Sequence, residues 1–197
     1  MLTSNEKQVL RWLAVNPRKD YSINEIARFC HLTPNGAYKL LAKLEKEQVL
    51  KAKSIANIKS YKLNFNSEKT DKILELSFMQ DITESRMKNR IEDFQPLKAV
   101  TRACIFFGSY ITAKKKPEDL DVLLIIDQVG FEGYKQALAK VQERTPLKIQ
   151  DIIQTTKDLE QNLKKEDPII GKALQKGIVI WGFDVLVQAI KNAAKQN

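Results

Sequence analysis

The sequence has little cysteine, histidine, glycine and proline, and these shortages exclude several classes of protein. Cys30 and Cys104 are the only cysteines and lie 74 positions apart, which is too few for a disulfide framework or a cysteine-based metal site. Seven glycines and six prolines, with 43% apolar residues, exclude a collagenous or low-complexity chain. Apolar runs such as Val122–Ile126 are only five residues long, and Met1–Glu6 holds no leader-like pattern. We therefore expect a cytoplasmic protein with no membrane partner and with reduced, buried thiols.

The positive charge of the chain is concentrated in its first third. The net charge is +9, from 33 basic and 24 acidic residues. Residues 1–66 carry 12 basic and 5 acidic side chains, a net of +7, whereas residues 67–197 carry 21 and 19, a net of +2. Gly36 is the only glycine of the first part, and the other six follow position 107. The two compositions predict two modules, and the first has the charge expected of a protein that meets a polyanion.

Helix-start signals divide the first module into three helices. Thr3–Glu6 and Ser22–Glu25 both have the S/T-x-x-E pattern of a capping box. Thr33 and Pro34 supply a third N-cap followed by proline at the first helical position. The second and third helices are separated by a short turn, which is the spacing of a helix-turn-helix.

A basic hairpin is predicted after the third helix. Residues 50–55 and 58–63 are two short strand-like runs around an Asn-containing turn, and no acidic residue occurs between positions 49 and 66. Residues 1–66 therefore resemble a winged-helix domain. The resemblance implies that the third helix enters the DNA major groove while the hairpin touches phosphates or the minor groove. The candidate DNA-contacting residues are Asn35, Tyr38, Lys39, Lys43, Lys51, Lys53 and Lys59.

Two alternatives to DNA binding stay open for this module. A winged helix can serve protein contacts, in which case its lysines form only a solvated face. It can also hold an RNA acceptor, although the sequence has no aromatic RNA-stacking motif in its favour.

Residues 67–96 are predicted to form a helical connector. They contain no glycine, and proline appears only at Pro96, while apolar residues recur at helical spacing from Ile73 to Ile82. One long helix or two would fit this pattern. The connector would either pack the modules together or form the interface of a homodimer.

Two carboxylates stand at the head of a predicted buried strand in the C-terminal part. Val100–Phe107 is strand-like and ends in Gly108-Ser109, and Asp119-Leu120-Asp121 then leads directly into Val122–Ile126. The i, i+2 spacing places Asp119 and Asp121 on one face of the strand. Because burying two carboxylates is costly without compensation, they are a plausible seat for a hard divalent cation.

A third aspartate occurs in the next predicted strand. Asp151 lies inside the apolar run Leu147–Ile153, and residues 131–144 between the two strands have a helical pattern. If the two strands are neighbours, Asp151 is expected beside the strand of Asp119 and Asp121.

Residues 98–182 resemble the DNA polymerase beta nucleotidyltransferase superfamily. The resemblance is carried by Gly-Ser, a spacer, an apolar-flanked Asp-x-Asp and a later strand Asp, in that order. The resemblance implies that Gly108 and Ser109 lie against the terminal phosphates of a nucleoside triphosphate. It also implies that Asp119 and Asp121 hold two Mg²⁺ ions, and that Asp151 completes one metal site and accepts the proton of the acceptor hydroxyl.

The chain departs from the family pattern after Gly108-Ser109. Many relatives continue with a small residue, an arginine and a glycine, whereas this chain has Tyr110-Ile111-Thr112. Lys114 and Lys115 are expected to bind the phosphates in place of the missing arginine, although a solvated basic run explains them equally well.

The sequence thus predicts an α+β protein with a winged helix over residues 1–66, a helical connector over 67–96 and a mixed-sheet nucleotidyltransferase-like domain over 97–197. The expected function is Mg²⁺-dependent transfer of a nucleoside monophosphate from a nucleoside triphosphate to an unknown hydroxyl acceptor, by a protein that also binds DNA. The alternative is a DNA-binding transcriptional regulator, of the kind found in toxin–antitoxin operons, whose nucleotidyltransferase-like domain senses nucleotide or is inactive.

Overall fold

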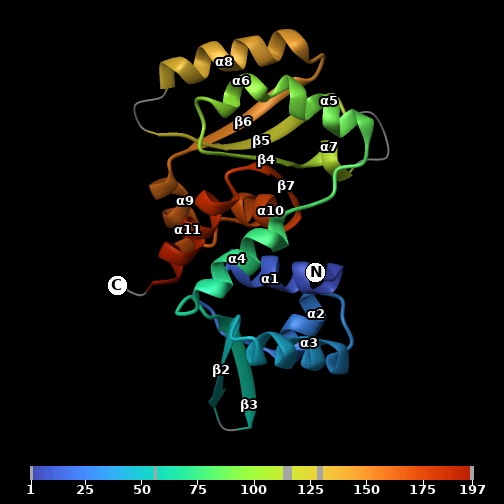
Figure 1. The fold of residues 1–197 in the computed structure, drawn as a ribbon, viewed down its shortest axis with the longest axis vertical. Coiled ribbons are helices and arrows are strands. Elements are labelled where there is room, and N and C mark those ends of the chain that lie inside the picture. The colour runs from blue at the N-terminus through green and yellow to red at the C-terminus, as the bar shows by residue number, and fades with distance from the viewer. Residues whose placement is uncertain (1, 56, 113–116, 128–130, 196–197) are drawn as a thin grey trace.

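The computed structural model describes residues 2–55, 57–112, 117–127 and 131–195, except for the side chain of Ile55 (Figure 1). It is an α+β fold with two separate sheets, as expected from the sequence. No helix within the described residues combines the length and the apolarity needed to cross a bilayer.

The N-terminal third contains three helices and a small sheet. Its elements are α1 (Ser4–Val15), β1 (Tyr21–Ser22), α2 (Ile23–Phe29), α3 (Pro34–Lys46), β2 (Leu50–Ile55) and β3 (Ile58–Leu63). The three predicted N-caps are confirmed: Thr3 and Ser22 form reciprocal capping boxes, and the Thr33 hydroxyl accepts a hydrogen bond from the Gly36 N–H. Because each cap satisfies backbone N–H groups that the helix leaves unpaired, local sequence alone determines where these helices begin.

The small sheet is antiparallel, with the strand order β1-β3-β2. Leu50 and Leu63 pair at the base of the β2–β3 hairpin and Ile55 pairs with Ile58 at its tip. Alternation along the strands buries Leu50, Tyr61 and Leu63 against the helices. The opposite face of the hairpin carries basic side chains. The hairpin itself projects away from the rest of the molecule (Figure 1).

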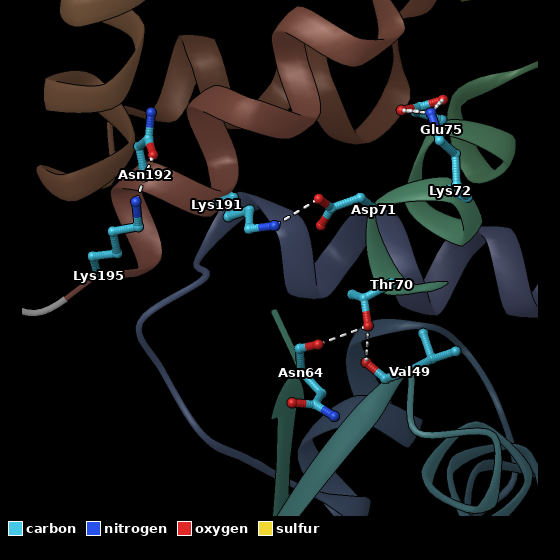
Figure 2. Close-up of polar contacts among 9 residues, drawn as sticks. All are labelled: Val49, Asn64, Thr70, Asp71, Lys72, Glu75, Lys191, Asn192 and Lys195. Atoms are coloured by element: carbon cyan, nitrogen blue, oxygen red, sulfur yellow. Dashed lines mark hydrogen bonds and ion pairs between the residues drawn. The ribbon is translucent and has the colours of Figure 1, made fainter. Parts of the chain in front are cut away.

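Over the predicted connector the structure has two helices, α4 (Glu68–Phe78) and α5 (Ser85–Asp93), which is one of the two alternatives, and the short α6 (Gln95–Lys98) begins at its end. Helix α4 packs against α1 and against the C-terminal helix, so it holds the modules together. Its first turn is fastened to the base of the hairpin, since the Thr70 hydroxyl donates to the backbone carbonyls of Asn64 and Val49 at 2.7 and 3.4 Å (Figure 2).

The C-terminal part is built around a four-stranded sheet with the order β6-β5-β4-β7. Strands β5 and β6 are parallel and joined through α8, and β4 pairs antiparallel with β5 and β7. The elements are β4 (Ala103–Phe107), α7 (Ser109–Thr112), β5 (Asp119–Ile125), α8 (Phe131–Arg144), β6 (Lys148–Gln154), α9 (Thr156–Lys164), α10 (Pro168–Lys176), β7 (Ile178–Trp181) and α11 (Phe183–Ala194).

Each face of this sheet buries a different hydrophobic cluster. Helices α5, α6 and α8 cover one face, and α9, α10 and α11 cover the other (Figure 1). Strand alternation sends Cys104 and Phe106 to the first cluster, and Ile105 and Phe107 to the second. The second cluster runs without interruption into the core of the N-terminal helices, so the two predicted modules share one continuous core.

A buried arginine joins the two parts of the chain. Arg11 of α1 is 6% exposed, and its guanidinium donates to the carbonyls of Leu174 at 2.7 and 3.0 Å and of Gly177 at 2.5 Å. It also lies over the ring of Phe78, 5.3 Å from the centroid. Burial lowers the pKa of Arg11 to about 10, so the guanidinium stays charged at neutral pH and satisfies the last carbonyls of α10.

Candidate functional sites

The Gly108-Ser109 turn brings the end of β4 against the head of β5. Phe107 pairs with Asp121 across the antiparallel ladder, and Gly108 then turns with φ +74° into α7. A Cβ atom at Gly108 would lie 1.8 Å from Asp121 Oδ2. Only glycine accommodates both the positive φ and this approach, and so the backbone of the turn lies directly on the Asp121 carboxylate.

Asp119 and Asp121 lie on the same face of β5, at the edge of that turn. The Ser109 hydroxyl is 3.4 Å from Asp119 Oδ1, and the Gln150 amide nitrogen is 2.6 Å from Asp119 Oδ2. Burial raises the pKa of the Asp121 carboxyl and the charge of Asp119 raises it further, while the Ser109 backbone N–H and the Lys172 ammonium offset part of the rise. Two half-buried carboxylates that repel each other in this way favour a bound cation.

The third predicted carboxylate does not join this pair. In the parallel ladder Asp121 pairs with Gln150, and Asp151 pairs with Val122. Paired residues share a face of the sheet, so Asp151 lies on the face opposite to that of Asp119 and Asp121. There its carboxylate accepts a hydrogen bond from the Tyr134 hydroxyl of α8.

The expectation that Asp151 completes a three-aspartate metal site therefore needs correction: the strands are neighbours and Asp151 borders the same groove, but the register places its side chain on the other face of β6, where it is hydrogen-bonded to Tyr134. Among the residues that the structure describes, no group of three or more His, Cys, Asp or Glu side chains is placed to hold a metal ion. Among the described residues, Asp119, Asp121, Ser109 and Gln150 bring oxygen-bearing side chains together on this edge of the sheet.

An open groove of about 770 Å³ lies beside the carboxylates. Among the described residues, two lysines line it, Lys148 at the start of β6 and Lys172 on α10, together with Ile169, which is 51% exposed. The sequence reasoning missed these residues and Gln150. Strand β6 was located correctly, but only its register with β5 shows that Lys148 and Gln150 lie on the carboxylate face.

The proposed phosphate-binding lysines Lys114 and Lys115 lie outside the described residues. The lysines that the structure places next to the carboxylates are Lys148 and Lys172. They supply positive charge to the groove that Gly108 and Asp121 also line.

The third helix presents a polar face at its N-terminal half. Asn35, Tyr38 and Lys39 are exposed, with Tyr38 at 53%, and among the described side chains none of the three makes a hydrogen bond or an ion pair. The side of α3 that faces inward buries Ala37 and Leu41. Helix α3 thus has one side in the core, and its N-terminal half leaves Asn35, Tyr38 and Lys39 in solvent.

Two of the candidate DNA-contacting lysines are held by carboxylates. Lys43 is 2.7 Å from Glu6, a carboxylate that is only 3% exposed, and Lys59 is 2.7 Å from Glu45. These contacts raise the pKa of both ammonium groups. Lys51 and Lys53 lie exposed on the outer face of the hairpin and make no ion pair with any described residue. The geometry thus divides the predicted set into two paired lysines and three, Lys39 included, that are open to solvent.

Comparisons with protein-family models, with curated proteins and with solved structures found no match to this chain.

Proposed function

We propose that the protein is a DNA-binding regulator whose N-terminal residues form a winged-helix domain. The order of elements supports this: α1, β1, α2 and α3 are followed by the β2–β3 hairpin, with β1 completing the sheet. This order is typical of winged helices, in which the third helix enters the major groove and the hairpin lies along the phosphates.

The observation that carries the proposal is the free polar face of α3. Asn35 and Tyr38 can reach base edges or the groove wall, and Lys39 has no carboxylate partner among the described residues. Lys51 and Lys53 extend the positive charge onto the hairpin. The excess of +7 over residues 1–66 gives this module the long-range attraction to DNA that precedes specific contact.

The DNA-binding proposal is tested by salt dependence. A duplex is selected from a random pool, and its affinity is measured by gel shift at several salt concentrations. Lys39→Gln and Lys53→Gln are each expected to reduce the slope of log affinity against log salt by about 0.9, because each removes one phosphate contact. Lys140→Gln, which removes an exposed charge on α8, is the matched control and leaves the slope unchanged. Absence of DNA affinity at low salt would contradict the proposal.

We further propose that the C-terminal domain is a nucleotidyltransferase-like module that senses a nucleoside triphosphate with one Mg²⁺. Asp119 and Asp121 would hold the cation, and the turn at Gly108-Ser109 would accept the phosphates through its backbone N–H groups. Lys148 and Lys172 add charge for the remaining phosphate oxygens. The residues fit one divalent cation; the amide of Gln150 stands where a second ion would need a third carboxylate.

Nucleotidyl transfer is the second candidate, and the contact between Gly108 and Asp121 favours it. A bound cation would supply neutralisation of the developing phosphate charge, while Ser109 orients Asp119 and the lysines hold the substrate. The test is incubation of the protein with labelled nucleoside triphosphates, Mg²⁺ and candidate acceptors, beside an Asp119→Ala/Asp121→Ala double variant.

The Asp151→Asn variant tests which face of the sheet carries the transfer. If transfer occurs and uses the side chains of the groove face, it is lost in the Asp119→Ala/Asp121→Ala variant and retained in Asp151→Asn, because the Asp151 carboxylate is held by Tyr134 on the other face. Label transfer that survives the double variant would rule out this site as its source. Nucleotide binding with no transfer to any acceptor would leave the sensor as the function of the groove.

A further inference from the structure

A second cleft, distant from the carboxylates, lies between the base of the hairpin and the end of α11. Its volume is about 310 Å³, within the range of small-ligand sites. In the described part of the chain, ten residues line the cleft, of which five are basic and none is acidic. The basic residues come from three parts of the chain that are distant in sequence: Arg18, Lys51, Lys62, Lys191 and Lys195.

Only part of this charge is neutralised within the protein. Lys62 pairs with Asp20 at 3.4 Å, and Lys191 reaches from α11 to Asp71 of α4 at 2.7 Å (Figure 2). Arg18, Lys51 and Lys195 make no ion pair with any described residue. Three positive charges are therefore left uncompensated around one cleft.

The dipole of α11 explains why two of the basic residues stand where they do, but not why the others lie in the same cleft. Lys191 and Lys195 stand at the C-terminal end of α11, where cations stabilise the helix dipole. Arg18 comes from the loop between α1 and β1, and Lys51 from the hairpin, and neither stands at the end of that helix. Because like charges brought together repel each other, folding places these groups opposite α11 at a cost that a bound anion would offset.

The walls of the cleft suit a compact ligand with a small apolar part. Leu63, Phe65 and Ala194 contribute apolar surface, while the basic groups line the same cavity. Arginine and lysine together are the side chains that bind phosphate oxygens in proteins, arginine through paired donors and lysine as a point charge.

We propose that this cleft is a metal-independent phosphate-binding site, formed jointly by the hairpin and α11. The phosphate groups can come from a free polyphosphate-bearing molecule or from the backbone of DNA already bound to α3. In either case the ligand would join the base of the hairpin to the C-terminal helix.

The experiment uses the full chain in EDTA at low ionic strength, so that no divalent cation can support binding at Asp119 and Asp121. Inorganic pyrophosphate and triphosphate are titrated by calorimetry into the wild type, into Arg18→Gln/Lys195→Gln and into Lys88→Gln/Lys140→Gln. The last variant is the control, because it also removes two positive charges, but from exposed positions on α5 and α8. Far-ultraviolet circular dichroism checks that all three proteins are folded.

If the source is a free molecule, Arg18→Gln/Lys195→Gln weakens pyrophosphate binding by about tenfold or more, and the control does not. If the source is DNA, pyrophosphate does not bind, but the same variant lowers the salt slope of duplex binding by about 1.8, which is two phosphate contacts. The proposal is overturned if the cleft variant differs from the control in neither assay. Since wild-type DNA affinity is measured in the same series, failure of the cleft and failure of DNA binding by α3 are told apart.

Discussion

Replacing Gly108 with alanine tests whether the turn and the Asp121 carboxylate form one unit. The backbone there has φ +74°, which costs a residue with a Cβ atom about 1–2 kcal/mol. The added methyl would also lie 1.8 Å from Asp121 Oδ2, so either the turn or the carboxylate must move. Overpacking of this kind costs about 1–3 kcal/mol. The free energy of unfolding is therefore expected to fall by about 2–5 kcal/mol.

The same substitution should weaken cation binding, because the carboxylate that holds the ion is the group displaced. We expect Mn²⁺ affinity, measured by calorimetry on the folded variant, to fall by about tenfold or more. Gly133→Ala is the matched control: Gly133 lies in α8, and its added Cβ would meet Val100 at an ordinary 3.4 Å. That change is expected to stabilise the helix by about 0.5–1 kcal/mol and to leave Mn²⁺ binding unchanged.

Urea unfolding and Mn²⁺ titration of the two alanine variants decide the matter. Equal stability and equal Mn²⁺ affinity of Gly108→Ala and wild type would refute the close approach of Gly108 to Asp121, and with it the geometry of the groove.

Three further predictions concern the carboxylate face and the shared core. Asp121→Asn should stabilise the metal-free protein at pH 7, because the folded-state pKa of Asp121 is raised above its unfolded value of 3.8. As the pH falls from the folded-state pKa to 3.8, the stability of the wild type should rise toward that of the variant, which urea unfolding at a series of pH values will measure. Gln150→Glu, an isosteric change 2.6 Å from Asp119, should raise Mn²⁺ affinity by about tenfold by adding a third carboxylate; unchanged affinity in calorimetry would count against the register of β5 and β6. Arg11→Met should lower the free energy of unfolding by about 2–4 kcal/mol by leaving the carbonyls of Leu174 and Gly177 unpaired, whereas Arg28→Met, at an exposed position, should change it little; equal urea midpoints would contradict this.

Local signals in the sequence were sufficient to place the helix starts and the strands that carry the site. The caps at Thr3, Ser22 and Thr33 act within one turn of chain, so their residue types determine the structure directly. The apolar run after Asp121 also identified β5 locally, because a short run of branched apolar residues flanked by turns is typical of a buried strand.

The register between strands and the packing of distant helices could not be predicted from such local signals. A shift of one residue in the pairing of β5 and β6 exchanges the faces of Gln150 and Asp151, and nothing in either strand sequence determines that register. Lys172 reaches the groove only because α10 packs beneath β4, a contact between segments far apart in the chain. The sequence left open whether the modules pack together, because charge and glycine content describe the surface and the turns, not which helix faces pack together.

Cross-linking from α3 tests the central claim most directly, because it identifies the surface that meets DNA. A photoreactive phenylalanine analogue is introduced at Tyr38, which is 53% exposed, and separately at Phe131, which is 46% exposed on α8. After irradiation with the selected duplex, we expect a cross-linked complex from position 38 and none from position 131. Cross-linking from position 131 alone, by a protein that still binds the duplex, would contradict this claim.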